Sequence, residues 1–315
     1  MAPQKFCELH VHIEGCVWDK HIENWWKKSE YLFPSISHYK RKTKNSFDLF
    51  LEQLRFGYNF LNSLEAYADL FNLYIEQAIK QNIYYAEVQI NYALISTWNI
   101  NFIELLRKVN NRNNSMLELR FIVDLPWQFN PSMLNQILEN PKVYQALGVV
   151  GIGFGGDEKL AEPMAFVEIR EKIADAGYKV LCHAGETTNY EFAKKIVDII
   201  KPDRIAHGLS LIPEIVKSPE QFPPIDICLS SNIQMGLVEN LNNHPINKLL
   251  KSEAIYTLST DDPAIFNTNL LKEYQLASEI EDFEKYLDNI HKHWYKAAFD
   301  KNGLLKSTVV NGLYN

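Results

Sequence analysis

The chain has 315 residues, 46% of them hydrophobic, which is enough for a large core in one big domain or two modest ones. Its net charge of −7 and its pI of about 5.8 argue against a general nucleic-acid binder or a protein of anionic membranes, because no basic field covers the chain. A basic run at residues 38–44 is short, and we expect it to be a solvated surface segment.

The N-terminal residues and the cysteines bear on the compartment. Met1–Lys5 lead directly into an apolar run without the features of a secretory signal. The sequence has no stretch of 18 apolar residues, the length that a membrane-spanning helix needs. The cysteines form no C-x-x-C pair, and most lie in strand-like apolar runs, where free cysteine is usually a small core residue. We expect a reduced, cytoplasmic protein without a membrane partner.

Short runs rich in β-branched residues alternate with segments that have helical apolar spacing, such as 165–176 and 190–200. This alternation predicts βαβ units and a parallel sheet. The expected strands are Phe6–His10, Ile83–Ile90, Leu119–Leu125, Val149–Phe154, Lys179–His183, Arg204–His207, Ile225–Leu229 and Ala254–Ser259. Eight such strands favour a closed (β/α)₈ TIM barrel, with an open doubly wound sheet as the alternative.

We expect one domain over residues 1–315. The first connection, residues 18–81, is long and rich in aromatic residues, and we expect a helical insertion that forms a lid over the barrel mouth. The stretch from Leu270 to Asn315 is expected to add helices outside the barrel.

Histidines and carboxylates stand at the ends of four expected strands. In chain order they are His10 and His12, His183 with Glu186, His207, and Asp261 with Asp262. The carboxyl ends of barrel strands converge on one mouth, where active sites lie. The period of two along a strand also turns the first two histidines toward the same face. We therefore expect one shared site.

Three imidazoles and one carboxylate of this set suit a zinc ion: His10, His12, His183 and Asp261. Zinc takes nitrogen and oxygen ligands at about 2.0–2.2 Å, and a catalytic site keeps a position for water. Bound zinc lowers the pKa of that water to about 7. We predict one catalytic Zn²⁺ per chain.

The remaining polar groups suit proton transfer and substrate binding. Glu186 is placed to shuttle protons, His207 to orient the water, and Asp262 to accept a hydrogen bond from a ring nitrogen of the substrate. Each group alone has an ordinary structural explanation, since an Asp-Asp-Pro sequence is typical of a helix start. The combination favours a catalytic site.

The sequence Gly151-Ile152-Gly153-Phe154-Gly155-Gly156 matches the dinucleotide-binding pattern G-x-G-x-x-G. Two of its glycines lie inside the expected strand rather than in the turn after it. Asp157 and Glu158 would also repel a pyrophosphate at that position. We interpret Gly155 and Gly156 instead as a lining that lets a flat ring approach the backbone.

Six segments carry recognisable motifs, in order over residues 6 to 277. They are Glu8–Gly15 (ELHVHIEG), Gly155–Glu158 (GGDE), His183–Glu186 (HAGE), Ala206–Gly208 (AHG), Leu229–Asn232 (LSSN) and Ser259–Pro263 (STDDP). Together they resemble the adenosine deaminase family. The resemblance implies hydrolytic removal of the 6-amino group of a purine nucleoside, with adenosine and deoxyadenosine giving inosine products and ammonia.

The resemblance also implies residue roles. His10, His12, His183 and Asp261 would bind zinc, with Glu186, His207 and Asp261 as the catalytic residues. Glu186 would protonate purine N1, and Gly156 and Asp262 would contact N3 and N7. The further substrate-binding residues are His12 and Glu14.

Position 14 departs from the animal-type adenosine deaminase pattern, in which an aspartate usually reaches the ribose 5′ hydroxyl. A glutamate at this position, Glu14 here, resembles the pattern of adenine deaminases and aminodeoxyfutalosine deaminases. Deamination of adenine or of aminodeoxyfutalosine is therefore the alternative activity. A carboxylate there would repel the 5′ phosphate of AMP. Two further alternatives are a non-catalytic nucleoside-binding relative and a two-metal amidohydrolase. The fourth strand ends without the lysine that often bridges two metals, which favours one metal.

Overall fold

The computed structural model describes residues 5–17, 46–113 and 117–310. Its centre is one parallel sheet in which eight strands pair in sequence order. They are β1 (Phe6–His12), β2 (Ile83–Asn91), β3 (Glu118–Pro126), β4 (Val149–Gly155), β5 (Lys179–Ala184), β6 (Arg204–His207), β7 (Ile225–Ile227) and β8 (Tyr256–Leu258).

The two edges of the sheet meet next to the first histidine pair. Val11 forms a parallel bridge with Asp261, just beyond β8. The amide of His12 donates to the Asp261 carbonyl at 2.9 Å, and the amide of Asp261 donates to the His10 carbonyl at 3.1 Å. The predicted (β/α)₈ barrel is confirmed, and the alternative of an open doubly wound sheet is wrong.

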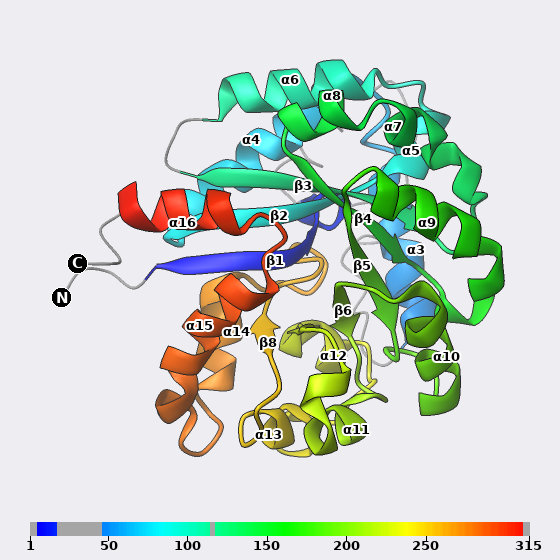
Figure 1. The fold of residues 1–315 in the computed structure, drawn as a ribbon. Coiled ribbons are helices and arrows are strands. Elements are labelled where there is room, and N and C mark those ends of the chain that lie inside the picture. Colours follow the sequence, from blue (N-terminus) through cyan, green and yellow to red (C-terminus); the bar gives the residue numbers. More distant parts are fainter. Residues whose placement is uncertain (1–4, 18–45, 114–116, 311–315) are drawn as a thin grey trace.

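Helices cover the outside of the barrel in the order that βαβ connections require (Figure 1). The α-helices are α3 (Phe47–Tyr58), α4 (Leu64–Lys80), α5 (Tyr92–Thr97), α6 (Phe102–Arg112), α7 (Asn135–Glu139), α8 (Pro141–Ala146), α9 (Val167–Asp175), α10 (Tyr190–Ile200), α11 (Ile212–Lys217), α12 (Leu229–Gln234), α13 (Ile246–Leu249), α14 (Leu270–Ala277), α15 (Leu287–Ala297) and α16 (Lys301–Val310). The 3₁₀ turns are η1 (Ile13–Cys16), η2 (Pro131–Leu134), η3 (Glu158–Leu160), η4 (Pro163–Phe166), η5 (Pro219–Gln221), η6 (Leu241–Asn243) and η7 (Phe283–Tyr286). Helices α14 to α16 are the C-terminal additions expected from the sequence.

All eight expected strands agree with the structure to within two residues, and the end of the seventh shows one difference in the type of element. We expected it to run to Leu229, but β7 ends at Ile227 and Leu229 begins α12. The apolar run that suggested a longer strand continues into a buried helix, because Leu229, Ser231 and Asn232 turn inward there. The spacing of apolar residues alone does not distinguish a buried strand from the first turn of a buried helix.

The glycines of β4 make room for side chains inside the barrel. A Cβ at Gly151 would lie 2.8 Å from the ring of Phe299, and one at Gly153 would lie 2.5 Å from Asp124 Oδ1. A Cβ at Gly155 would lie 2.7 Å from His183 Nδ1. The flat ring that approaches Gly155 therefore belongs to the protein, which corrects our interpretation of that glycine. These glycines lie in the strand, so the motif is not a phosphate-binding turn.

The described part of the long first connection consists of α3 and α4. Phe50 of α3 packs with Met235 and Phe266 in a small apolar cluster separate from the main core. The ring centroids of Phe50 and Phe266 are 5.3 Å apart. Residues 18–45, including the basic run 38–44, lie outside the described residues, so the lid over the mouth stays a prediction.

Two smaller expectations also concern the fold. All four cysteines are buried and none forms a disulfide. Within the described ranges, we find no helix with the length and apolar character needed to cross a bilayer.

Candidate metal and substrate site

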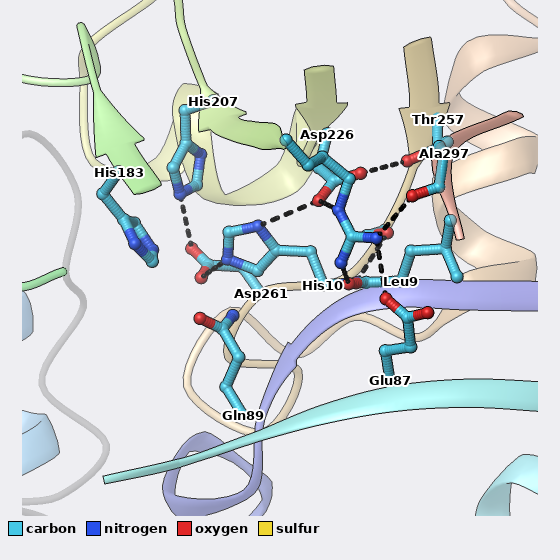
Figure 2. A network of polar contacts seen from close by, with 12 residues as sticks. Leu9, His10, Glu87, Gln89, His183, His207, Asp226, Thr257, Asp261 and Ala297 are labelled. Atoms are coloured by element: carbon cyan, nitrogen blue, oxygen red, sulfur yellow. Dashed lines mark hydrogen bonds and ion pairs between the residues drawn. The ribbon is translucent and has the colours of Figure 1, made fainter. Parts of the chain in front are cut away.

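The barrel brings together the histidines and the aspartate that the sequence singled out (Figure 2). Nε2 of His10 lies 3.3 Å from Nε2 of His12, and Nε2 of His12 lies 3.3 Å from Nε2 of His183. Oδ1 of Asp261 lies 3.3 Å from His10 Nε2 and 3.5 Å from His12 Nε2. Four donor atoms from three distant parts of the chain thus surround one point.

These spacings fit a metal ion. A tetrahedral centre with bonds of about 2.0–2.1 Å separates its ligands by about 3.3–3.4 Å, and the observed distances are 3.3–3.5 Å. Burial lowers the pKa of His10 and of His12 to about 3, so both imidazoles are neutral at physiological pH, as metal ligation requires. His207 also lies close enough to His10, His183 and Asp261 to form a ligand group with them. We assign it no ligand role because its Nε2 is 3.9 Å from Asp261 Oδ2.

A backbone carbonyl fixes the orientation of one ligand imidazole. Nδ1 of His183 lies 3.1 Å from the carbonyl of Phe154, which directs Nε2 toward the centre. Nε2 of Gln89 lies 3.3 Å from His12 Nε2. In the part of the chain that the structure describes, Nδ1 of His10 has no hydrogen-bond partner, and Asp226 Oδ2 lies 3.8 Å from it.

The structure shows which contacts two residues of the LSSN motif make. The hydroxyl of Ser231 donates to Asp261 Oδ2 at 2.6 Å. Nδ2 of Asn232 lies 3.2 Å from Nδ1 of His207. Two residues at the start of α12 thus orient the two polar groups on either side of the centre, which their sequence positions alone did not reveal.

Asp261 and His207 share an unusual backbone conformation. Their φ angles are +64° and +59°, in the left-handed region that non-glycine residues seldom adopt. Burial alone would raise the pKa of Asp261, but the imidazoles of His207 and His10 hold this pKa well below its usual range. Asp261 is therefore an ionised carboxylate, as a metal ligand must be.

Glu186 faces the same centre from the turn after β5. Its Oε1 lies 3.5 Å from His207 Nε2. Burial raises the pKa of Glu186 well above its usual value, and the charges of Asp261 and Glu158 raise it further. A carboxyl that keeps its proton near neutral pH can act as a general acid.

Glu158 holds the turn that carries this acid. Its carboxylate accepts hydrogen bonds from the amides of Gly185 at 3.0 Å and Glu186 at 2.8 Å. Glu158 is fully buried, and the hydroxyl of Thr188 also donates to it. From the sequence we expected Glu158 to repel a pyrophosphate and to belong to the GGDE motif. Its role in holding the turn was not apparent, because its partners lie 27 and 28 residues away.

The side chain of Asp262 packs directly against the backbone of Gly15. A Cβ at Gly15 would lie 1.9 Å from Asp262 Oδ1, so only glycine leaves room for that carboxyl. Oδ1 of Asp262 is buried, and no described residue forms a hydrogen bond with it. Burial and the neighbouring Asp261 raise the pKa of Asp262 well above its usual value. An unpartnered polar atom at this position is suited to a substrate.

Glu14 is more constrained than the sequence suggested. Its Oε1 already accepts hydrogen bonds from the amide of Asn91 at 2.9 Å and the hydroxyl of Tyr67 at 3.0 Å. Burial raises the pKa of Glu14 to about 7, although these bonds oppose the shift. Glu14 therefore anchors the turn after β1 to the end of β2.

A cavity of about 340 Å³ opens above the centre. All eight predicted site residues other than the deeper His10 line it, and α3 supplies much of its apolar wall. The predicted residues in the lining are His12, Glu14, Gly156, His183, Glu186, His207, Asp261 and Asp262. Asn91 and Asp124 also line the cavity, and the sequence analysis assigned them no role.

Arg204 of β6 forms a buried polar network with residues of β1, β2 and β7, and Figure 2 shows its partners Leu9, Glu87 and Asp226. Its guanidinium bonds Asp226 and Glu87 at 2.7 Å each, and it donates to the carbonyl of Leu9 at 2.6 Å. The hydroxyl of Thr257 donates to Asp226 at 2.6 Å. This network holds a carboxylate beside His10 and closes the lumen under the candidate metal site.

Replacing Arg204 with methionine is expected to lower the free energy of unfolding by about 3–5 kcal/mol, because two buried carboxylates lose their cation. Urea denaturation measures this change. The control is Arg112→Met, which removes exposed pairs with Glu65 and Asp69 and should cost less than about 1 kcal/mol. Equal, small losses in both variants would show that the network does not stabilise the barrel.

Comparison with known proteins gives a consistent assignment. The family model of adenosine deaminase matches residues 5–308. The chain is 26% identical to adenosine deaminase of Gallus gallus over 88% of this chain and 85% of the relative. It is 27% identical to adenine deaminase of Crocosphaera subtropica over 94% and 96% of the two chains. A zinc-bound amidohydrolase of Burkholderia ambifaria has the same fold, with a TM-score of 0.83, 19% identity and coverage of 98% and 90%.

Proposed function

The chain belongs to the adenosine deaminase family, and from this premise we propose that it is a zinc-dependent enzyme that deaminates a 6-aminopurine nucleoside. Adenosine and 2′-deoxyadenosine would give inosine and 2′-deoxyinosine plus ammonia. The observation that carries the proposal is the set of four metal-donor atoms at 3.3–3.5 Å beside a carboxyl whose pKa is raised.

His10, His12, His183 and Asp261 would hold the zinc ion, which supplies hydroxide at neutral pH by lowering the pKa of a bound water. A zinc-bound structural neighbour supports this choice of metal. His207, held through Nδ1 by Asn232, would orient the attacking oxygen through Nε2. Because no thiol takes part in the donor set, the ligands are all nitrogen and oxygen, which zinc accepts.

Glu186 would donate its proton to N1 of the purine as the oxygen adds to C6. The backbone of Gly156 and the carboxyl of Asp262 would pair with N3 and N7. Both residues line the cavity, and the free Oδ1 of Asp262 supports the second contact. The protein groups thus neutralise charge that develops on the ring during addition.

The cavity lining offers acidic groups and little positive charge to a phosphate, which favours an uncharged nucleoside over a nucleotide. Six carboxyl groups line it: Glu14, Asp124, Asp157, Glu186, Asp261 and Asp262. Among the described lining residues, Arg55 is the only lysine or arginine. A 5′ phosphate would add repulsion in this setting.

Free adenine is the second candidate substrate, because the chain is as similar to an adenine deaminase as to an adenosine deaminase. Aminodeoxyfutalosine remains an alternative for the same reason, since a relative of that name is 27% identical over 48% of this chain.

Ammonia release from a substrate panel tests the proposal. We expect turnover of adenosine and 2′-deoxyadenosine to exceed that of adenine, aminodeoxyfutalosine and AMP. Treatment with a zinc chelator should abolish turnover, and zinc should restore it. Preference for adenine or aminodeoxyfutalosine would replace the nucleoside assignment, and chelator-resistant turnover would contradict the metal assignment.

A further inference from the structure

Asp124 is a buried carboxyl in the candidate cavity that no step of the proposed reaction uses. It lies near the end of β3, where it pairs in register with Asn91 of β2 and Gly153 of β4. The side chain is only 4% exposed, yet the residue lines the cavity. Its position on the barrel wall is therefore below the space that a substrate would fill.

The neighbouring strand is built to accommodate this carboxyl. A Cβ at Gly153 would lie 2.5 Å from Asp124 Oδ1, so any larger residue there would displace the oxygen. Two positions earlier on β3, Ile122 faces the interior apolar cluster with Leu181 and Ala206. Asp124 thus places an ionisable side chain at an interior position at the level where the cavity begins.

Oδ1 of Asp124 has no hydrogen-bond partner among the residues that the structure describes. Leaving a buried polar group unsatisfied costs about 1–3 kcal/mol, so such a group calls for a specific explanation. Burial, together with the charge of Glu14, raises the pKa of Asp124 to about 8. A carboxyl in either protonation state can pair with a hydroxyl group, which both donates and accepts.

The position of Asp124 around the barrel indicates which part of the substrate it meets. The metal donors come from β1, β5 and the residues after β8, and none comes from β2, β3 or β4, which lie together along one side of the lumen. A purine with C6 at the metal directs its other end, which carries the sugar at N9, away from those donors. Glu14, the expected sugar contact, has Oε1 occupied by Asn91 and Tyr67.

We propose that Asp124 determines specificity for the sugar by forming a hydrogen bond with a hydroxyl group of the nucleoside. This inference rests on the proposed nucleoside deaminase activity. In that activity N1, N3 and N7 pair with Glu186, Gly156 and Asp262, and N9 carries the sugar. The polar groups that remain without a partner are the sugar hydroxyls.

The test combines one substitution with the removal of single hydroxyls from the substrate. Wild type and Asp124→Ala are compared on adenosine, 2′-deoxyadenosine, 3′-deoxyadenosine and 5′-deoxyadenosine, with kcat/KM measured for each. We expect Asp124→Ala to lower kcat/KM for adenosine about 10–100-fold. For the one analogue that lacks the contacted hydroxyl, the variant and the wild type should differ less than about 2-fold. Asp124→Asn, which keeps a donor and an acceptor, should recover part of the loss.

Asp157→Asn is the matched control. Asp157 lines the same cavity, but its Oδ1 accepts from the amide of Lys159 and begins η3. This variant should show the same relative activity on all four nucleosides. Calorimetric binding of inosine and its deoxy analogues repeats the comparison without turnover.

The outcomes separate the two proposals. If wild type releases no ammonia from any nucleoside, the proposed function is wrong and the sugar contact is wrong with it. If wild type is active but Asp124→Ala lowers kcat/KM equally for every nucleoside and for adenine, the residue is structural and only this inference is overturned. No loss on adenosine would overturn it as well.

Discussion

Glu186→Gln is expected to lower kcat for deamination by about 10²–10⁴-fold while zinc stays bound, because the amide cannot transfer a proton to the purine. The substitution keeps the size and shape of the side chain. The turn that carries it remains tied to Glu158 through the amides of Gly185 and Glu186, since backbone groups make those bonds. The loss should therefore reside in the chemical step rather than in folding.

Steady-state kinetics with adenosine, together with metal analysis of the same preparation, measures this effect. The control is Glu191→Gln, because Glu191 lies five residues further along, at the exposed start of α10. That variant should retain wild-type kcat. Wild-type turnover in Glu186→Gln would remove the residue from the mechanism, whereas lost zinc would show that it supports the metal site instead.

His183→Ala should remove zinc and, with it, all measurable deamination. His183 is the donor from β5, and its Nε2 lies 3.3 Å from His12 Nε2. Its ring fills the space that Gly155 leaves open and is fixed by the Phe154 carbonyl. Loss of a supporting group around a metal site costs about 10–100-fold in affinity. Loss of a direct ligand should cost more than that.

Competition with a chromophoric chelator gives the zinc dissociation constant, and elemental analysis gives the metal content after dialysis. His291→Ala is the control, because His291 stacks on Trp294 in α15, on the outside of the barrel. It should keep one zinc per chain. An unchanged dissociation constant in His183→Ala would exclude the proposed ligand set, and two zinc ions per wild-type chain would favour a two-metal enzyme.

The fold followed from local sequence patterns. All eight strands and their parallel order were predictable because β-branched runs and helical apolar spacing alternate over the whole chain. The error at the seventh strand arose where an apolar run continues into α12. A local pattern does not show whether buried apolar residues belong to a strand or to a helix.

The sequence by itself determined which residue types stand at the strand ends, and therefore that His10, His12, His183 and Asp261 could share one centre. Their spacing to within 3.5 Å depended on barrel closure, which pairs the end of β1 with Asp261. The tertiary structure alone decided which carboxyls keep their protons, because burial and neighbouring charges set the pKa of Glu186 and Asp124. It also decided that Glu14 bonds the protein while Oδ1 of Asp124 has no partner within the described residues. Those contacts join residues distant in sequence, and no local pattern encodes them.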